Sequence, residues 1–493
     1  MKRIYFITFI SAILSALPFT FPSLFFLSLL APSAFFYLLL KCSNTTCVKI
    51  SFLWPVTYHL AIHYYFLALY PLDFAGLSSV ASILVVGIAW LGISLFQGSF
   101  LGVVFCLYKK FFKSSALVLS ALFAICEYLQ SLGFIGFPWG QISLTQWKFL
   151  PFIQSLSLFG PYFITFLIIL LNTLLAKFFL FKNKKYLLIA IAVFVVNVSF
   201  GALRLYFNNS AYADLSVGVV QPSITTENKW DEKLGKNSFD VHMSLSEKVK
   251  NSDIIIWPET AVASELLTQP YRMSTLHDFI RENDNDFIIG TFYTEKRKTY
   301  NSAAYIDKDS TLLYHKRHLV PFGEYVPGRA FFEAVLPFLT DINMLSSDLA
   351  KGESANVFDT PHGKIGALVC FDSIFTDLAR DSAKNGAELL TIITNDSWYK
   401  DSVALTHHNA QAVFRAVENN RYVVRCANTG ISSFIDNTGR VLFKTSPNQV
   451  GAYQEDVSMI SQKSLYTTLG NISIPIFTLL IFLIFVYRKQ KRL

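Results

Sequence analysis

Long apolar runs separated by short polar stretches fill most of the first 204 residues and return near the C-terminus. A helix needs about 20 apolar residues to cross the hydrocarbon core of a membrane. Because Lys2 and Arg3 precede a short first run, that run also resembles a signal peptide, but a signal peptide does not explain the runs that follow. We therefore predict eight spans, at roughly 4–18, 20–40, 51–70, 79–107, 115–132, 158–181, 186–204 and 468–487.

The pattern changes between the last two of these runs. Short β-rich segments recur there, and helical patterns fill several of the gaps between them, which predicts a layered α/β domain with mixed sheets. The chain is thus divided into a membrane domain (1–204), an α/β domain (205–467) and a last span with a basic tail (468–493). The predicted strands are 215–220, 253–257, 287–292, 302–307, 364–371, 389–394, 422–427 and 431–435, and the predicted helices are about 233–249, 265–282, 373–385 and 404–420.

Composition agrees with a membrane protein. Only 15% of the residues are charged and 53% are hydrophobic, whereas globular chains are about 25% charged, so disorder and an ordinary soluble enzyme are excluded. The net charge of +8 is unevenly distributed: +11 over 1–204, −7 over 205–487 and +4 in the tail. Because the excess of bases lies in the membrane segments, the charge gives no reason to expect a nucleic-acid partner.

Lysine and arginine in the short loops predict the orientation of the spans, because cytoplasmic loops are enriched in these residues. The predicted outside loops are poor in bases: 71–78 has none and 133–157 has only Lys148. Both termini are therefore predicted in the cytoplasm and the α/β domain outside it. The predicted inside segments carry Lys2 and Arg3; Lys41 and Lys49; Lys109, Lys110 and Lys113; Lys182, Lys184 and Lys185; and the tail 488–492.

Some polar residues of the membrane domain have two interpretations. Glu127 lies in the middle of a span, where an acid is either functional or packed by hydrogen bonds to a neighbouring helix. His59 and His63 are spaced to share one helix face and could hold a metal, but no Cys or acid accompanies them locally, which favours packing. Neither GxGxxG nor GxxxxGK[ST] occurs where a nucleotide would need it, and we expect no metal and no cofactor.

Three polar residues of the α/β domain lie at strand or turn ends. Cys370 ends an apolar strand, at the kind of position where α/β enzymes place catalytic groups, and a deprotonated thiol can attack a carbonyl. Glu259 follows a strand that Pro258 ends, and a carboxylate there can accept a thiol proton. Lys316 lies in a segment that turns apolar, where its charge can stabilise an oxyanion. Alternatively, Cys370 is a core residue, or it forms a disulfide with Cys426.

The motifs around these residues resemble the carbon–nitrogen hydrolase (nitrilase) superfamily, and more closely its membrane-embedded apolipoprotein N-acyltransferase family. The resemblance spans nearly the whole chain. It rests on CEYLQSLGFIGFPWGQISLTQ (126–146) in the membrane part and on VVQPSI, WPETA, YHKRHLVPFGEYVP, LVCFDSIF and TNDSWY in the α/β domain.

The resemblance implies an α-β-β-α sandwich inserted in an all-α membrane domain of about eight helices. It also implies a bacterial inner membrane, with the sandwich in the periplasm. It assigns the base to Glu259, the lysine to Lys316 and the nucleophile to Cys370. Residues expected to support the site or bind substrate are Trp230, Glu324, Phe371 and Asp372, where Phe371-Asp372 replaces the family's usual Tyr-Glu.

The implied reaction moves an acyl chain from a phospholipid, typically phosphatidylethanolamine, through a cysteine thioester. The acceptor is the α-amino group of an S-diacylglyceryl cysteine at the N-terminus of an apolipoprotein, in the last step of lipoprotein maturation. A membrane-anchored amidase that uses water instead of the amine is the alternative enzyme, and a transporter or receptor is the non-enzyme alternative. The apolar stretch Phe331, Phe332, Val335, Leu336, Phe338 and Leu339 is either a lid that enters the outer leaflet or a core helix.

Overall fold

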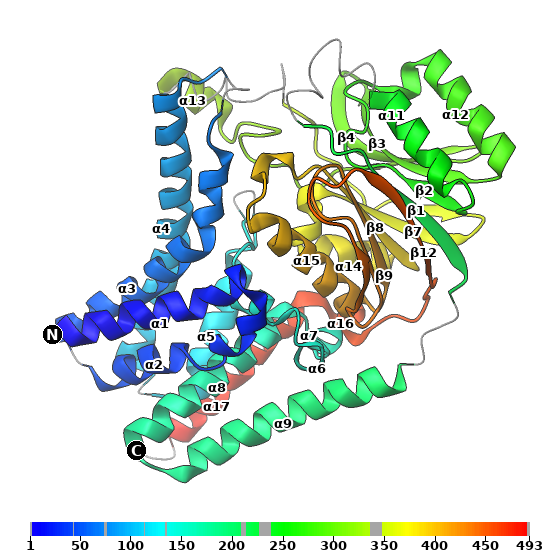
Figure 1. Cartoon of the computed structure of the whole chain (residues 1–493). Helices are drawn as coiled ribbons and strands as arrows, with labels where there is room; N and C mark the ends of the chain where they lie inside the picture. Colours follow the sequence, from blue (N-terminus) through cyan, green and yellow to red (C-terminus); the bar gives the residue numbers. More distant parts are fainter. Residues whose placement is uncertain are drawn as a thin grey trace. The chain divides into compact units, whose positions relative to one another are not determined.

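The computed structural model describes residues 2–42, 44–72, 76–112, 114–133, 136–208, 213–225, 238–335 and 348–490 (Figure 1). Two compact units are present. The helical unit comprises 1–67, 85–208 and 464–493, and the α/β unit comprises 68–84 and 209–463. The short segment 68–84 therefore packs with the α/β residues, although it lies between apolar helices in the sequence.

The helical unit is built from apolar helices joined by short turns. Aromatic side chains fill its interior, where Trp54 stacks on Phe35 and Tyr58 with ring centroids 5.1 Å apart in both pairs. The helices are α1 (Lys2–Thr20), η1 (Pro22–Leu27), α2 (Pro32–Lys41), α3 (Asn44–Ile62), η2 (His63–Leu69), α4 (Ser79–Phe111), α5 (Ala116–Leu129), η4 (Ile142–Gln146), α6 (Leu150–Ile153), α7 (Leu156–Phe159), α8 (Pro161–Phe181), α9 (Lys184–Phe207), α16 (Leu465–Leu469), η11 (Gly470–Ile472) and α17 (Ser473–Gln490).

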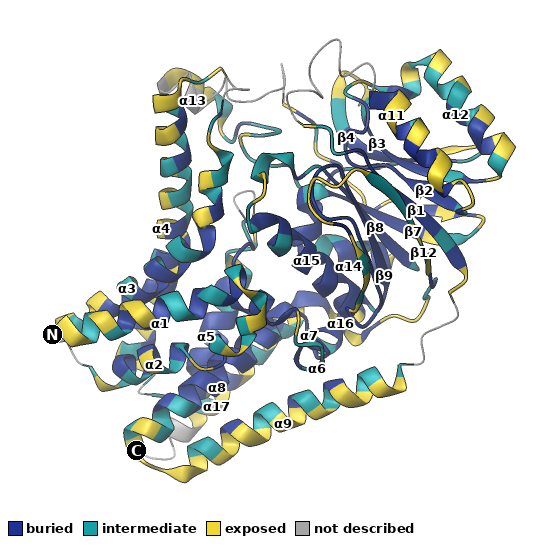
Figure 2. Ribbon diagram, viewed as in Figure 1, coloured by how far each residue is buried: buried dark blue, intermediate teal, exposed yellow. Residues whose placement is uncertain are grey.

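Among the described residues, six helices are long and apolar enough to cross a membrane. The two other predicted spans coincide with α3 and α5, and α5 has only 14 residues. Many apolar side chains on α9 are exposed, as the yellow stretches in Figure 2 show, and such a surface suits lipid rather than water. The six helices are Lys2–Thr20, Pro22–Lys41, Ser79–Phe111, Pro161–Phe181, Lys184–Phe207 and Leu465–Tyr487.

The α/β unit contains two six-stranded mixed sheets. The first has the order β12-β1-β2-β3-β4-β5 and the second the order β11-β10-β9-β8-β7-β6. In each sheet three neighbouring strands are parallel: β1, β2 and β3 in the first, and β7, β8 and β9 in the second. The strands are β1 (Leu215–Gln221), β2 (Ile254–Ile256), β3 (Asp286–Glu295), β4 (Lys298–Ile306), β5 (Thr311–His315), β6 (Val357–Thr360), β7 (Gly363–Val369), β8 (Leu389–Thr394), β9 (Tyr422–Ala427), β10 (Ser433–Ile435), β11 (Val441–Lys444) and β12 (Gly451–Val457).

Alternating side chains explain why the sheets stack between two helical layers. Ile254 and Ile256 point into the core between the sheets, while Ile255 packs in the core beneath the helices, as expected for a strand period of two. The first sheet is covered by α11 (Ser238–Ser246) and α12 (Pro270–Asn283), and the second by α14 (Thr376–Lys384) and α15 (Ala404–Asn419). The predicted α-β-β-α sandwich is therefore confirmed.

All eight predicted strands are present, but four strands were not predicted: β5, β6, β11 and β12. These lie at or next to the sheet edges, where half of each strand faces water, so their sequences lack the apolar runs of the central strands. The strand predicted to end at Phe371 ends instead at Val369. The possible disulfide is absent, since Cys370 and Cys426 are both free thiols.

Candidate active site

Cys370 lies on a sharp turn directly after β7. Its φ of +49° is in the left-handed region, which costs energy for a residue with a side chain. Two hydrogen bonds hold the turn: the Val369 amide donates to Asp372 Oδ2 (3.2 Å), and the Ser373 hydroxyl donates to the Cys370 carbonyl (2.7 Å). The short helix η9 (Cys370–Ile374) starts at this point. The turn thus presents Cys370 at the carboxyl end of the parallel strands.

Glu259 is buried and held by three hydrogen-bond donors. Its Oε1 accepts from Lys316 Nζ (3.2 Å) and from Asn301 Nδ2 (2.8 Å). Its Oε2 accepts from the backbone amide of Asn395 (2.8 Å). The donors come from both sheets, because Asn301 belongs to β4 in the first sheet and Asn395 follows β8 in the second. The carboxylate is therefore fixed between the sheets.

Lys316 lies directly after β5 and is only 1% exposed. Its Nζ also donates to Glu324 Oε1 (2.9 Å), so one ammonium group faces two carboxylates. Burial alone would lower the pKa of Lys316, but the charges of Glu259 and Glu324 outweigh it and raise this pKa well above its ordinary value. The lysine stays protonated, as an oxyanion-stabilising cation must.

Asn301 was missed by the sequence analysis. Its side-chain Nδ2 donates to Glu259 Oε1 (2.8 Å) and to Glu324 Oε1 (2.9 Å). Its backbone carbonyl accepts from the backbone amide of Lys316 (2.8 Å). Asn301 does not stand out in the sequence, because β4 also carries Lys298, Thr299 and Ser302. Its partners are set by strand pairing and not by any local motif.

Asp372 joins the lysine segment to the cysteine turn. Its carboxylate accepts from the Tyr314 hydroxyl (2.8 Å) and from the amides of His318 (2.7 Å) and Arg317 (3.2 Å). Burial raises the pKa of Asp372 to about 6, although Lys316 and these donors oppose the shift. The shorter acid, in place of the family's Glu, thus reaches both segments.

Phe371 points into an aromatic cluster and is 5% exposed. Its ring lies 5.7 Å from His318 and 5.3 Å from Phe375, and the His318 ring stacks on Phe375 at 3.7 Å. Because the aromatic contacts surround the ring, the hydroxyl of the family's usual Tyr is not needed to bury this side chain.

The Cys370 thiol is held in its protonated form. Burial raises its pKa, and so do the charges of Glu259 and Asp396, while Lys316 and a hydrogen bond with Thr394 lower it. A protonated thiol is a poor nucleophile, so attack on a carbonyl requires a base. Glu259 is the carboxylate with the largest effect on the thiol.

Two other predictions lie outside what the structure describes. Trp230 is among the residues that are not described, and so are the side chains of the proposed lid stretch. Within that stretch only the backbone of α13 (Arg329–Val335) is described. Both stay predictions.

Glu127, His59 and His63, the three polar residues singled out in the membrane domain, each make hydrogen bonds. Glu127 accepts from the Ile142 amide (2.9 Å) and from the Thr165 hydroxyl (2.5 Å), as in the packed-acid interpretation. The His63 ring is hydrogen-bonded to Gln97 (2.6 Å), and His59 to the Pro55 carbonyl (2.7 Å).

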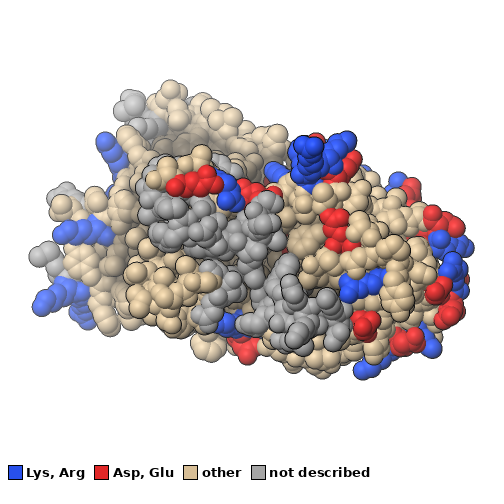
Figure 3. All heavy atoms as spheres, turned by 90° about the horizontal axis from the view of Figure 1, so that it is seen from above, with Lys and Arg blue, Asp and Glu red and all other residues tan. Residues whose placement is uncertain are grey.

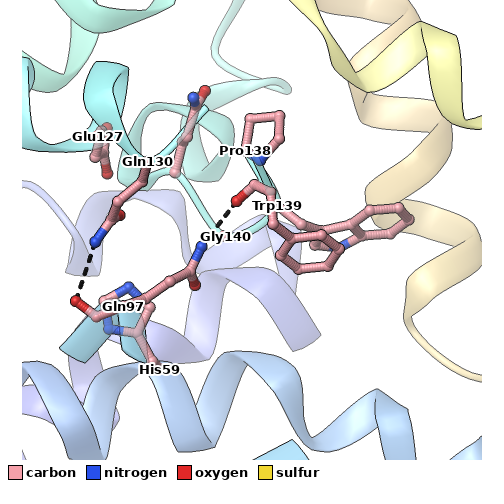
Figure 4. A pocket seen from close by; sticks show the side chains of 9 residues that line it. His59, Gln97, Glu127, Gln130, Pro138, Trp139 and Gly140 are labelled. Carbon is pink, nitrogen blue, oxygen red and sulfur yellow. Dashed lines mark hydrogen bonds between the residues drawn. The ribbon is translucent and has the colours of Figure 1, made fainter. Parts of the chain in front are cut away.

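A small cavity of about 10 Å³ lies among these residues, between His59, Gln97, Glu127, Gln130 and the 137–141 segment (Figure 4). That volume suits about one water molecule. In the described part of the chain, no group of three or more His, Cys, Asp or Glu side chains could hold a metal.

Charged side chains of both signs are interspersed on the face shown in Figure 3, where Asp and Glu lie beside Lys and Arg. The basic net charge does not form a continuous surface on that face.

Comparison with known proteins identifies the family. Residues 216–462 match the carbon-nitrogen hydrolase family model, and residues 11–174 match that of the apolipoprotein N-acyltransferase N-terminal domain. An apolipoprotein N-acyltransferase from Geobacter metallireducens is 32% identical over 70% of this chain and 69% of its own length. One from Pasteurella multocida is 27% identical over 97% of this chain and 94% of its own.

A solved CN-hydrolase superfamily protein from Xanthomonas campestris is 16% identical, with a TM-score of 0.38 over 54% of this chain and 96% of that one. The two family models together cover both the helical and the α/β parts of the sequence. The chain therefore belongs to the apolipoprotein N-acyltransferase family and carries a carbon–nitrogen hydrolase domain.

Proposed function

We propose that this protein transfers an acyl chain from a phospholipid to the N-terminal amine of a diacylglyceryl apolipoprotein. The observation that carries the proposal is the buried cluster of Glu259, Lys316 and Glu324 beside the strained Cys370 turn. This cluster has the three parts that acyl transfer through a thioester needs: a nucleophile, a base and a fixed cation.

In the first step, Glu259 accepts the thiol proton while Cys370 Sγ attacks the sn-1 ester carbonyl of the lipid. The positive charge of Lys316 stabilises the resulting oxyanion. Burial strengthens this electrostatic attraction. The ester C–O bond then breaks, and Glu259 returns the proton to the leaving alkoxide. The products are a lysophospholipid and a thioacyl-enzyme. Phosphatidylethanolamine is the proposed donor.

In the second step, the α-amino group of the lipoprotein attacks the thioester carbonyl. Glu259 takes a proton from the amine, the C–S bond breaks, and the proton returns to the Cys370 sulfur. The product is an N-acylated lipoprotein, and the enzyme regains its starting state. Exclusion of water keeps the thioester from hydrolysis, which distinguishes this reaction from that of an amidase.

We also propose that the catalytic domain faces the periplasm. The segment 68–84 includes the loop with no basic residue, which is predicted to lie outside, and it packs in the same unit as 209–463. Within that unit, Lys400 Nζ donates to the Tyr70 carbonyl (2.5 Å). Contact between a base-free loop and the α/β residues supports placing both on the outer side.

The test is to incubate the full-length protein in mixed micelles with phosphatidylethanolamine that carries a radiolabelled sn-1 chain. Wild type is expected to acquire a label that hydroxylamine releases, while Cys370→Ser acquires none. Adding a diacylglyceryl peptide should move the label to the peptide. Labelled enzyme that releases only free fatty acid to water, with no transfer to the peptide, would support the amidase instead. Label retained by Cys370→Ser would reject this nucleophile.

A further inference from the structure

A second polar cluster lies behind the Cys370 turn, and the proposed chemistry does not use it. Asp396 follows β8, His408 belongs to α15, and Arg425 belongs to β9. Each is at most 1% exposed. Figure 2 shows α15 almost entirely buried, which is unusual for a helix that carries two histidines and two charged side chains.

The cluster forms a continuous hydrogen-bonded path to the nucleophile. Arg425 Nη2 donates to Asp396 Oδ2 (2.5 Å), and Asp396 Oδ1 is hydrogen-bonded with His408 Nδ1 (2.8 Å). On its other side, the His408 ring contacts Ser373 Oγ (2.9 Å) and the Cys370 carbonyl (3.2 Å) through Nε2. The path ends where the Ser373 hydroxyl donates to that same carbonyl.

The turn after β8 also holds Glu259, the proposed base. Asn395 directly precedes Asp396, and its amide donates to Glu259 Oε2 (2.8 Å). The Asn395 side chain is fixed in turn by Asn428 Nδ2 (2.9 Å). Two adjacent residues after β8 therefore connect to Glu259 on one side and, through His408, to Cys370 on the other.

Stability alone is a poor reason for such a cluster. Buried ion pairs are often no more stabilising than well-packed apolar residues of similar volume, because the charges must be desolvated. Cys370 has a strained backbone, however, and such a conformation persists only where its surroundings hold it. The Cys370 carbonyl is the backbone group on which the path converges.

We infer that Asp396 and His408 are positioning residues that hold the Cys370 turn and align its thiol with Glu259 for attack on the lipid donor. The inference rests on the proposed function. Neither residue touches the reacting atoms; His408 acts through Ser373 and the Cys370 carbonyl. Since small misplacements of reacting groups cost up to about 100-fold, we expect His408→Gln to slow thioester formation by roughly 10- to 100-fold.

The experiment measures single-turnover thioester formation on the full-length protein, with labelled phosphatidylethanolamine in mixed micelles. His408→Gln should lower the rate at saturating lipid and leave the half-saturating lipid concentration unchanged. Ser373→Ala, which keeps the imidazole, should lower the same rate. Since both changes break one path, the double variant should be no slower than the slower single variant.

The matched control is His242→Gln. His242 is equally buried but lies on α11, in the other helical layer, where its ring packs 4.8 Å from Trp257. This variant should lose thermal stability without a selective loss of the saturated rate. Thermal unfolding of every variant separates misfolding from misalignment.

Failure of the inference and failure of the proposed function look different. If folded Ser373→Ala and His408→Gln form the thioester at the wild-type rate, or if their losses multiply in the double variant, the positioning role is wrong. A change confined to the half-saturating lipid concentration would also overturn it. If wild type itself forms no thioester, the proposed function fails before the inference is reached.

Discussion

One ammonium group and two carboxylates share the buried space beside the nucleophile. Lys316 lies within 3.2 Å of Glu259 and 2.9 Å of Glu324, so the three side chains together carry one negative charge. Burial raises the pKa of the Cys370 thiol, and the charge of Glu259 raises it further, because a buried thiolate beside a carboxylate is unfavourable. The thiol of Cys370, the proposed nucleophile, is therefore held in its protonated form.

This electrostatic arrangement predicts opposite effects of one substitution on two reactions of the same thiol. Glu259→Gln removes a charge that raises the pKa of Cys370, while Lys316, which lowers it, stays. More thiolate is then present at a given pH below the thiol pKa, so alkylation of Cys370 by iodoacetamide should become faster. Thioester formation should instead fall by roughly 100-fold or more, because general-base catalysis is lost.

Mass spectrometry of the Cys370 peptide over pH 6 to 9 measures the alkylation, since the chain has 6 cysteines. Glu247→Gln is the matched control, because Glu247 is a surface residue paired with Lys250 and its side chain is 56% exposed. It should change neither reaction. Slower alkylation in folded Glu259→Gln would contradict the electrostatic account.

Asn301 gives the second prediction for a single residue. Asn301→Leu removes the amide that bridges Glu259 and Glu324. Loss of a partner to buried acceptors costs about 1–3 kcal/mol, so the melting temperature of the full-length protein should fall by several degrees. Acylation should fall as well, because Glu259 loses one of its three donors.

The control for this change is Asn285→Leu. Asn285 is also buried and donates to two backbone carbonyls, those of Lys250 and Ser252. Its replacement should lower the melting temperature by a similar amount but leave the acylation rate of the folded protein unchanged. Equal rates in the two variants would show that Asn301 only stabilises the fold.

The three proposed catalytic residues could be found from the sequence because Glu259 and Cys370 follow or end apolar runs and Lys316 lies just before an apolar segment. The residues that hold them could not. Asn301, Asp396 and His408 lie on separate elements, and their partners depend on which strands pair and on how the sheets stack. A hydrogen bond such as that between Asn301 and Glu259 spans 42 positions and has no signature in either segment.

At the scale of elements, Glu259, the proposed base, lies in the segment after β2, which packs closely against β3. β3 runs parallel to β2, and just beyond β2 the Gly290 carbonyl accepts from the Ala261 amide (2.8 Å). A Cβ atom at Gly290 would lie 2.4 Å from the Pro258 carbonyl oxygen and 2.6 Å from Glu259 Cα. Backbone cannot yield as a flexible side chain does, so glycine is required at this crossing.

Gly290→Ala should therefore displace the Glu259 segment and lower the thioester formation rate by up to about 100-fold. Gly218→Ala is the matched strand control, because its Cβ would mainly meet the side chains of Ser252 and Val249. The control should reduce the melting temperature more than the activity. A folded Gly290→Ala protein with wild-type acylation would mean that the Glu259 segment tolerates the shift.

Central and edge elements also differ in how well sequence predicts them. β7, β8 and β9 read as apolar runs because both of their faces are buried. The four missed strands have exposed or half-buried positions and resemble loops in sequence. The fold class could thus be predicted from its core, while the outer strands of both sheets became evident only in the structure.

For the whole molecule, the number of membrane crossings decides where the active site faces. Four apolar helices, α4, α5, α8 and α9, separate the 71–78 loop from the α/β residues in the sequence. With four crossings, the 71–78 loop and the α/β residues lie on the same side of the membrane. With three crossings, they lie on opposite sides. The shortest is α5, whose 14 helical residues span only about 21 Å, less than the roughly 30 Å of a hydrocarbon core.

Packing within the α/β unit argues that α5 completes a crossing. Residues 68–84 and 209–463 belong to one compact unit, and Lys400 contacts the Tyr70 carbonyl. Two segments in contact lie on the same side of a membrane, so the number of crossings between them is even. The flanking residues of the predicted 115–132 span then extend the apolar length of α5.

An even number of crossings predicts that cysteine labelling in intact cells finds the loop before α4 and the α/β unit on the same side of the membrane. Ser78→Cys, in the loop before α4, should react with a membrane-impermeant maleimide added outside, and so should Lys400→Cys in the α/β unit. Lys184→Cys, at the first residue of α9, should react only after the membrane is permeabilised, because the basic segment 182–185 is predicted to be cytoplasmic. The parent protein without these substitutions controls for its native thiols.

Labelling of Ser78→Cys and Lys400→Cys from opposite sides would make the number of crossings odd. The periplasmic placement of the catalytic domain would then fail together with the eight-span topology.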